Sequence, residues 1–182
     1  PTLMAVRHSL AMTFQSLDRL EQAQEEFNKL IPKARGRIAL KGRTDSARSN
    51  LVKILLASAS LDRRLDHDPT AGRKKLEEAF ELTREILEKP RPQEGSPGKQ
   101  ELLQLHAAAA MSLGVEYLRE GRVKDTEKVF STAMDANAEV LDTIRAESGF
   151  DSLSEDERDT RTAALQMNLD KSKVGLAYIR LR

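Results

Sequence analysis

The segment SLGVEYLREGRVKDTEKVFSTAM, residues 112–134, carries the pattern that decides the fold. Its apolar residues recur every three or four positions on both sides of Gly121, which is the spacing of two helices joined by a turn. The pattern occurs again near the start of the chain, and its first part returns as KVGLAYIRLR at residues 173–182. A recurring helical hairpin predicts an all-α array of helix pairs.

Two copies of this pattern agree in spacing at seven positions. The copy at residues 113–134 has Leu113, Gly114, Tyr117, Gly121, Thr126, Phe130 and Ala133. The copy at residues 10–30 has, at the same offsets, Leu10, Ala11, Phe14, Asp18, Ala23, Phe27 and Leu30. A partial copy begins at Val174, and a weaker one begins at Leu56.

These spacings resemble the tetratricopeptide repeat (TPR), whose pattern is L-G-x₂-Y followed by A-x₃-F. The resemblance implies a right-handed α-solenoid of about seven antiparallel helices, in which small residues such as Gly114 let paired helices approach closely. The copies start 46, 57 and 61 residues apart, so the chain resembles a degenerate, long-repeat variant. Its general character is similar to repeat regions of large bacterial signalling proteins. The alternative is a helical bundle without repeats, whose similar segments reflect shared composition.

Helix-breaking residues divide the chain into seven predicted helices. They cover residues 2–16, 18–41, 45–66, 69–88, 98–119, 122–147 and 155–182. We group them into a single TPR-like domain over 1–182, with helix pairs at 1–42, 44–88 and 98–147 and an unpaired final helix at 155–182. Pro32 predicts a kink or an early stop in the second helix. We expect the chain to be a piece of a longer protein.

Two helix starts are marked by capping residues. Asp68 followed by Pro69 is typical of an N-cap with proline at the first helical position. Ser154 and Glu157 have the spacing of a capping box. The cluster of Asp66, His67 and Asp68 could touch a metal ion, but we interpret it as a helix end followed by that N-cap.

Composition excludes several classes of function. Thirty basic and 29 acidic residues leave a net charge of +1, which gives no global field to attract nucleic acid or an anionic membrane. No apolar run reaches the length of about 20 residues that a bilayer requires, so we expect no membrane insertion. No signal-peptide pattern is visible, and we expect a cytoplasmic location.

Motifs of catalysis and of cofactor binding are missing from the sequence. The three histidines form no HExxH pair, and neither GxSxG nor GxGxxG occurs. Paired carboxylates lie where solvated helix faces are predicted, rather than in a dry cleft that acid–base catalysis needs. We therefore predict a protein that is not an enzyme, with no catalytic residue, no metal and no cofactor.

One basic cluster lies between residues 33 and 48. Its members are Lys33, Arg35, Arg37, Lys41, Arg43 and Arg48, with Asp45 as the single acid among them. Such a cluster can contact an acidic partner, a phosphopeptide or nucleic acid. We interpret it instead as a solvated helix end, and no aromatic residues lie among its members to stack bases.

The TPR resemblance places a bound protein or peptide on the concave face formed by the first helix of each pair. Transferred by offset, the candidate binding residues are His8, Met12, Gln15, Ala108, Met111, Val115, Leu118, Arg119, Leu176 and Arg180. The second pair is aligned too poorly for such a transfer. The alternative is a structural spacer or self-association module whose groove is filled by its own side chains.

The final helix would lack the partner that the other pairs have. Its apolar residues Val174, Leu176, Tyr178, Ile179 and Leu181 would then stay uncovered, and exposed apolar patches drive association. We therefore predict self-association through residues 169–182, or a helix that folds back on the chain.

Overall fold

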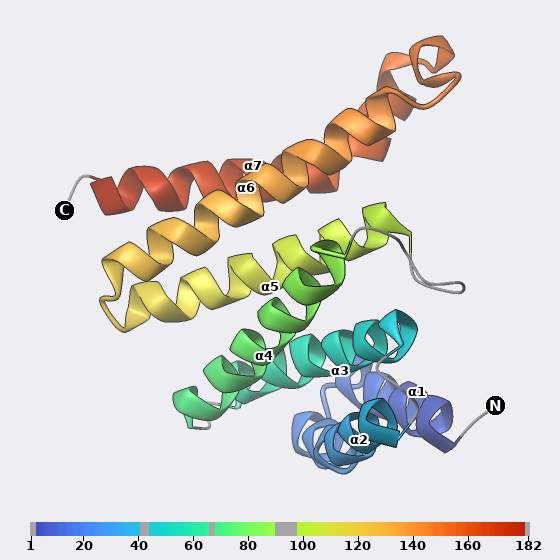
Figure 1. Cartoon of the computed structure of the whole chain (residues 1–182), viewed down its shortest axis with the longest axis vertical. Helices are drawn as coiled ribbons and strands as arrows, with labels where there is room; N and C mark the ends of the chain where they lie inside the picture. The colour runs from blue at the N-terminus through green and yellow to red at the C-terminus, as the bar shows by residue number, and fades with distance from the viewer. Residues whose placement is uncertain (1–2, 41–43, 66–67, 90–97, 181–182) are drawn as a thin grey trace. The chain divides into compact units, whose positions relative to one another are not determined.

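The computed structural model describes residues 3–40, 44–65, 68–89 and 98–180, and within these ranges the chain is all-α (Figure 1). The helices are α1 (Leu3–Ser16), α2 (Leu20–Leu40), α3 (Asp45–Arg64), α4 (Pro69–Leu87), α5 (Lys99–Arg119), α6 (Val123–Arg145) and α7 (Glu155–Arg180), with a short 3₁₀ turn at Phe150–Ser152. The predicted number of helices is confirmed, and the ends of the described helices agree with prediction to within two residues.

Contacts divide the chain into two compact units. Unit 1 comprises Pro1–Pro97 and unit 2 comprises Gly98–Arg182, so the division falls in the Pro- and Gly-rich stretch 89–100. In unit 1, α1 packs on α2, α2 on α3, and α3 on α4. In unit 2, α5 packs on α6, and α6 packs on α7. Each helix therefore lies against its neighbour in sequence within its unit.

The turns after α1 and α5 have the same backbone geometry, as the matching spacing predicts. Asp18 and Gly121, which correspond in the two copies, adopt positive φ angles of 58° and 71°. A left-handed residue at this position closes the preceding helix, and glycine or aspartate tolerates it best. In each turn the next amide donates to a carbonyl five residues back, over 2.9 Å: Arg19 to Phe14, and Arg122 to Tyr117. The guanidinium groups of the same two arginines lie 5.0 and 3.9 Å from the centroids of those rings.

Close helix approach in unit 2 centres on Phe130 of α6, which is 3% exposed. A Cβ atom added to Gly114 of α5 would lie 2.4 Å from the ring, and one added to Gly175 of α7 would lie 2.5 Å from it. Both distances are far below van der Waals contact. The ring is therefore held between the backbones of two helices, at positions where only glycine fits.

The final helix is covered better than the sequence indicated. Leu176 and Ile179 are 8% and 7% exposed, and they form a buried cluster with Phe130. Our expectation that Leu176 and Ile179 would lack cover is wrong, because Gly175 lets α7 pack closely against Phe130 of α6. Val174 and Tyr178 remain 69% and 43% exposed. Leu181 lies outside the described residues.

The second helix continues through Pro32 to Leu40, so the expected early stop is also wrong. Proline removes one backbone hydrogen bond from a helix interior. Residues on either side of it, Leu30, Ile31 and Ala34, are at most 5% exposed. Burial of these side chains against neighbouring helices offsets the lost bond and keeps the segment helical.

Both predicted caps are confirmed. The Asp68 carboxylate accepts a hydrogen bond of 2.9 Å from the Thr70 amide, which lowers the pKa of Asp68. Glu157 accepts bonds from the Ser154 hydroxyl and amide, of 2.8 and 2.9 Å, and these lower the pKa of Glu157. Asp66 and His67 lie outside the described residues.

We predict that Gly114→Ala and Gly175→Ala each destabilise the protein, although alanine favours helix by about 1 kcal/mol. Forcing a methyl group against the Phe130 ring costs about 1–3 kcal/mol, which outweighs that gain. Urea unfolding measures the effect. In a Phe130→Leu background the cost should shrink, because the ring that clashes is gone.

Gly36→Ala is the matched control, since Gly36 is also helical but an added Cβ would meet nothing within 4 Å. That variant should be more stable by about 0.5–1 kcal/mol. Equal responses at all three glycines would contradict the close packing around Phe130.

Candidate functional site

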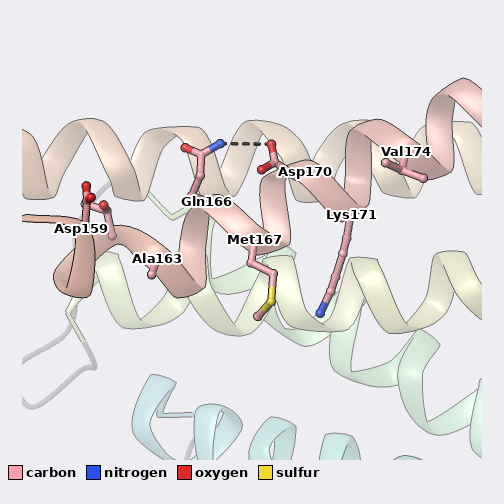
Figure 2. A pocket seen from close by; sticks show the side chains of 8 residues that line it. Asp159, Ala163, Gln166, Met167, Asp170, Lys171 and Val174 are labelled. Carbon is pink, nitrogen blue, oxygen red and sulfur yellow. Dashed lines mark hydrogen bonds between the residues drawn. The ribbon is translucent and has the colours of Figure 1, made fainter. Parts of the chain in front are cut away.

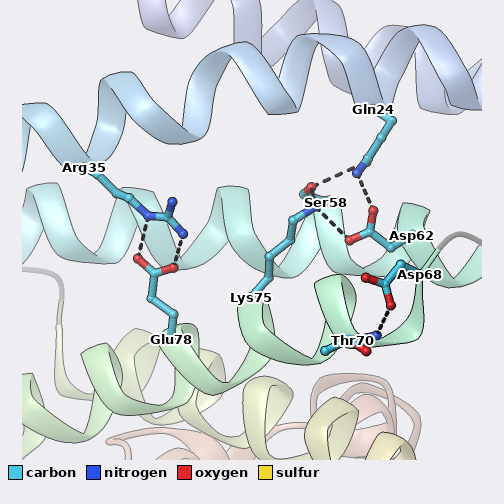
Figure 3. Close-up of polar contacts among 8 residues, drawn as sticks. All are labelled: Gln24, Arg35, Ser58, Asp62, Asp68, Thr70, Lys75 and Glu78. Carbon is cyan, nitrogen blue, oxygen red and sulfur yellow. Dashed lines mark hydrogen bonds and ion pairs between the residues drawn. The ribbon is translucent and has the colours of Figure 1, made fainter.

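A buried polar cluster joins three helices of unit 1 and contains serine, lysine and aspartate, which are residue types that catalysis uses (Figure 3). The Lys75 ammonium of α4 lies 2.8 Å from the Ser58 hydroxyl and 2.7 Å from the Asp62 carboxylate, both on α3. Gln24 of α2 donates to the other oxygen of Asp62 over 2.5 Å and accepts from Ser58 over 3.4 Å.

The geometry of this cluster favours a structural role. A serine beside a lysine can act as an activated nucleophile only if a substrate reaches its oxygen. Ser58 is 0% exposed, and Asp62 is 4% exposed. Each polar atom of the cluster finds its partner within it, which is what stabilises buried polar groups. The cluster therefore ties α2 and α4 to α3.

Two adjoining hollows open between α1, α2 and α3, with volumes of about 200 and 270 Å³. We call them together the α1–α3 groove. They share Met4, Arg37 and Asn50. The first hollow is also lined by Ala5, His8, Lys53 and Ile54, and the second by Ala34, Thr44, Ser46 and Ala47. The groove thus combines small and apolar side chains with cationic and neutral polar ones.

The basic cluster predicted from the sequence is divided by the fold. Arg35 pairs with both oxygens of Glu78 (Figure 3). Arg48, whose side chain is 7% exposed, lies 3.5 Å from Glu85. Arg37 is exposed and lines both hollows of the α1–α3 groove, and no carboxylate of the described residues pairs with it. Lys41 and Arg43 lie outside the described residues.

In unit 1, one predicted binding residue reaches the groove. His8 is half-buried, lines the first hollow, and stacks edge-on against Phe27 with ring centroids 6.1 Å apart. Met12 is 44% exposed and Gln15 is half-buried, and neither lines the groove. Arg37, Asn50 and Lys53 were missed as groove residues. The signal for Arg37 was its basic neighbourhood, whereas the poor alignment of the second pair hid the α3 residues.

In unit 2, most predicted binding residues fill the space between helices. Met111, Val115 and Leu118 pack against the cluster that contains Phe130 and Leu176. The sulfur of Met111 also lies 2.8 Å from the hydroxyl of Ser172, a fully buried residue of α7.

The remaining predicted residues of unit 2 lie elsewhere on its helices. Ala108 is exposed, and Arg119 is exposed and lies 3.4 Å from Glu116. Arg180 is the last residue of α7.

An exposed face of α7 forms a third, shallow hollow of about 690 Å³ (Figure 2). Its lining residues follow one side of the helix: Asp159, Thr162, Ala163, Gln166, Met167, Asp170, Lys171 and Val174. Met167 and Val174 are 52% and 69% exposed. This α7 face therefore mixes three apolar side chains, Ala163, Met167 and Val174, with polar and charged ones.

Membrane-spanning helices and metal-binding clusters are both absent from the described part of the chain. None of its helices combines the length and apolarity that crossing a bilayer requires. Within the same ranges, no three His, Asp or Glu side chains are grouped so that they could hold a metal ion.

Comparison with protein-family models, with curated proteins and with solved structures gave no match for the chain.

We predict that Lys75→Met destabilises the protein by about 3 kcal/mol, because it leaves the Asp62 carboxylate buried without its cation. The double variant Asp62→Leu/Lys75→Met should recover much of that loss, since an apolar pair can replace a buried ion pair. Denaturant unfolding of the single and double variants measures the coupling. If the double variant lost as much stability as Asp62→Leu and Lys75→Met together, the result would contradict a stabilising contact between the two buried charges.

Proposed function

We propose that the chain is a non-enzymatic protein-interaction module that binds a segment of another protein in the α1–α3 groove. The observation that carries this proposal is the groove itself, which lies between α1 and α3, the first helices of two consecutive pairs, and is also lined by Ala34 and Arg37 of α2. In the TPR-like arrangement that the sequence resembles, the first helices form the ligand-binding face. We further propose that the pairs belong to a right-handed solenoid of this kind.

Chemistry of the groove supports a peptide ligand. Small side chains such as Ala5, Ala34 and Ala47 leave room for a backbone to approach, and Met4 can repack around irregular shapes. Polar groups along the same walls can fix the register of an extended segment. Unit 2 offers less room, since Met111, Val115 and Leu118 pack against its own core.

A second candidate function is self-association through α7, as the sequence suggested for residues 169–182. The α7 face favours it because Met167 and Val174 are exposed. Asp159 and Lys171 lie six residues on either side of Leu165. In an antiparallel pair of α7 helices centred there, each aspartate would face the lysine of the other copy, and Ala163 would face Met167.

We predict that Asn50→Trp blocks peptide binding, because position 50 borders both hollows of the groove and an indole there would obstruct a bound segment. Dodecapeptides selected from a random displayed library on the 182-residue chain supply the labelled probes. Fluorescence anisotropy should show at least a tenfold loss of affinity in the variant.

Asn28→Trp is the matched control, since Asn28 is an exposed residue of α2 outside the groove. It should bind the same peptides as tightly as the unaltered chain. Failure to select any peptide, or equal binding by both tryptophan variants, would rule out the groove as the binding site.

For the second candidate, we predict that Asp159→Lys weakens dimer formation and that the double variant Asp159→Lys/Lys171→Asp restores it. The single change places like charges opposite each other, whereas the double change exchanges the two signs. Sedimentation equilibrium measures the association. A chain that stays monomeric at concentrations of about 100 μM would contradict association through α7 at a useful affinity.

A further inference from the structure

The charged side chains that line the α1–α3 groove have one sign. They are Arg37 and Lys53, and no acidic residue is among the described residues of its walls. Asn50, Thr44 and Ser46 add neutral hydrogen-bonding groups. A hollow lined by cations and low-polarity walls concentrates a positive potential, and this favours an anionic ligand. The net charge of +1 conceals this local excess.

The position of Arg37 contrasts with that of its neighbours. Arg35 and Arg48 are directed to Glu78 and Glu85, so their charges are compensated within unit 1. Arg37 has no such carboxylate among the described residues, and it borders both hollows. A guanidinium group binds a carboxylate through two parallel hydrogen bonds. A carboxylate of a bound ligand could pair with Arg37 as Glu78 pairs with Arg35.

The remaining walls indicate what carries that carboxylate. Met4, Ala5, Ala47 and Ile54 give the groove an apolar part that a small inorganic anion would leave unfilled. Phe, Tyr and Trp are absent from the described lining residues, so a nucleobase would have only the His8 imidazole and the Arg37 guanidinium to stack on. A peptide with acidic and apolar side chains in alternation matches both features.

We propose that the α1–α3 groove recognises an acidic protein segment, in which a Glu or Asp carboxylate pairs with Arg37 beside Asn50 and neighbouring apolar side chains occupy the hollows. This inference rests on the proposed function, because it names the partner of the same groove. Lys53 adds a second positive charge to the lining of the first hollow.

Three labelled dodecapeptides of alternating Leu and Glu, Leu and Gln, or Leu and Lys test the inference by fluorescence anisotropy. The Glu peptide should bind at least tenfold more tightly than the Gln peptide, and the Lys peptide more weakly still. Arg37→Glu should reduce the affinity for the Glu peptide at least tenfold.

The matched control is Lys33→Glu, which makes the same charge change one turn earlier on α2. Lys33 is exposed and does not line the groove. It should change the affinity for the Glu peptide less than threefold, because screened surface charges act weakly at a distance. Equal losses in both variants would overturn the inference, since they would indicate general attraction between opposite charges.

Asn50→Trp separates the inference from the proposed function. If the Glu and Gln peptides bind equally and both are blocked by Asn50→Trp, the groove binds peptides but has no preference for acid, and the inference fails alone. If the peptides bind but none is blocked by Asn50→Trp, the proposed function fails together with the inference.

Discussion

The contact of the Phe130 ring with two glycines sets the spacing of unit 2. The ring lies within 3 Å of the points where Cβ atoms would be on Gly114 of α5 and Gly175 of α7. This contact fixes the distance of both helices from α6. Leu176 and Ile179 are buried because α7 lies so close, and Met111, Val115 and Leu118 are drawn into the same cluster. The packing that gives unit 2 its core thus also uses residues that the sequence predicted for ligand binding.

Unit 1 uses the same pattern with a different result. Ala11 and Phe27 occupy the positions of Gly114 and Phe130, and both are fully buried. Here His8 rests against Phe27, and the walls nearby carry alanines and polar groups beside Met4 and Ile54. Space therefore remains between α1, α2 and α3. Small differences at equivalent positions decide whether the inner face of a helix array is filled or open.

Local signals in the sequence were sufficient for the helices and their ends. Periodicity, the caps at Asp68 and Ser154, and the matched turns at Asp18 and Gly121 depend on residues within a few positions of each other. The errors came from longer-range packing. Burial of Leu30, Ile31 and Ala34 keeps the helix intact through Pro32. Close approach of the helices at Gly114 and Gly175 buries Leu176 and Ile179 against Phe130.

The groove was predicted only in part for the same reason. His8 could be placed by its offset in the repeat. Arg37 was seen as one member of a basic cluster, but its separation from Arg35 and Arg48 depends on where Glu78 and Glu85 lie in three dimensions. Asn50 and Lys53 could not be assigned to the groove, because the pattern that would align α3 with α1 is weak.

The Phe130 ring, which contacts both α5 and α7, also affects how unit 2 unfolds. Because α5 and α7 rest on opposite sides of Phe130, neither can detach without leaving the ring exposed on that side, so fraying of the last helix would loosen the packing of the other two. Helices α5, α6 and α7 should therefore lose protection from hydrogen exchange as one cooperative block. Helix α7 therefore belongs to the same cooperative folding unit as α5 and α6.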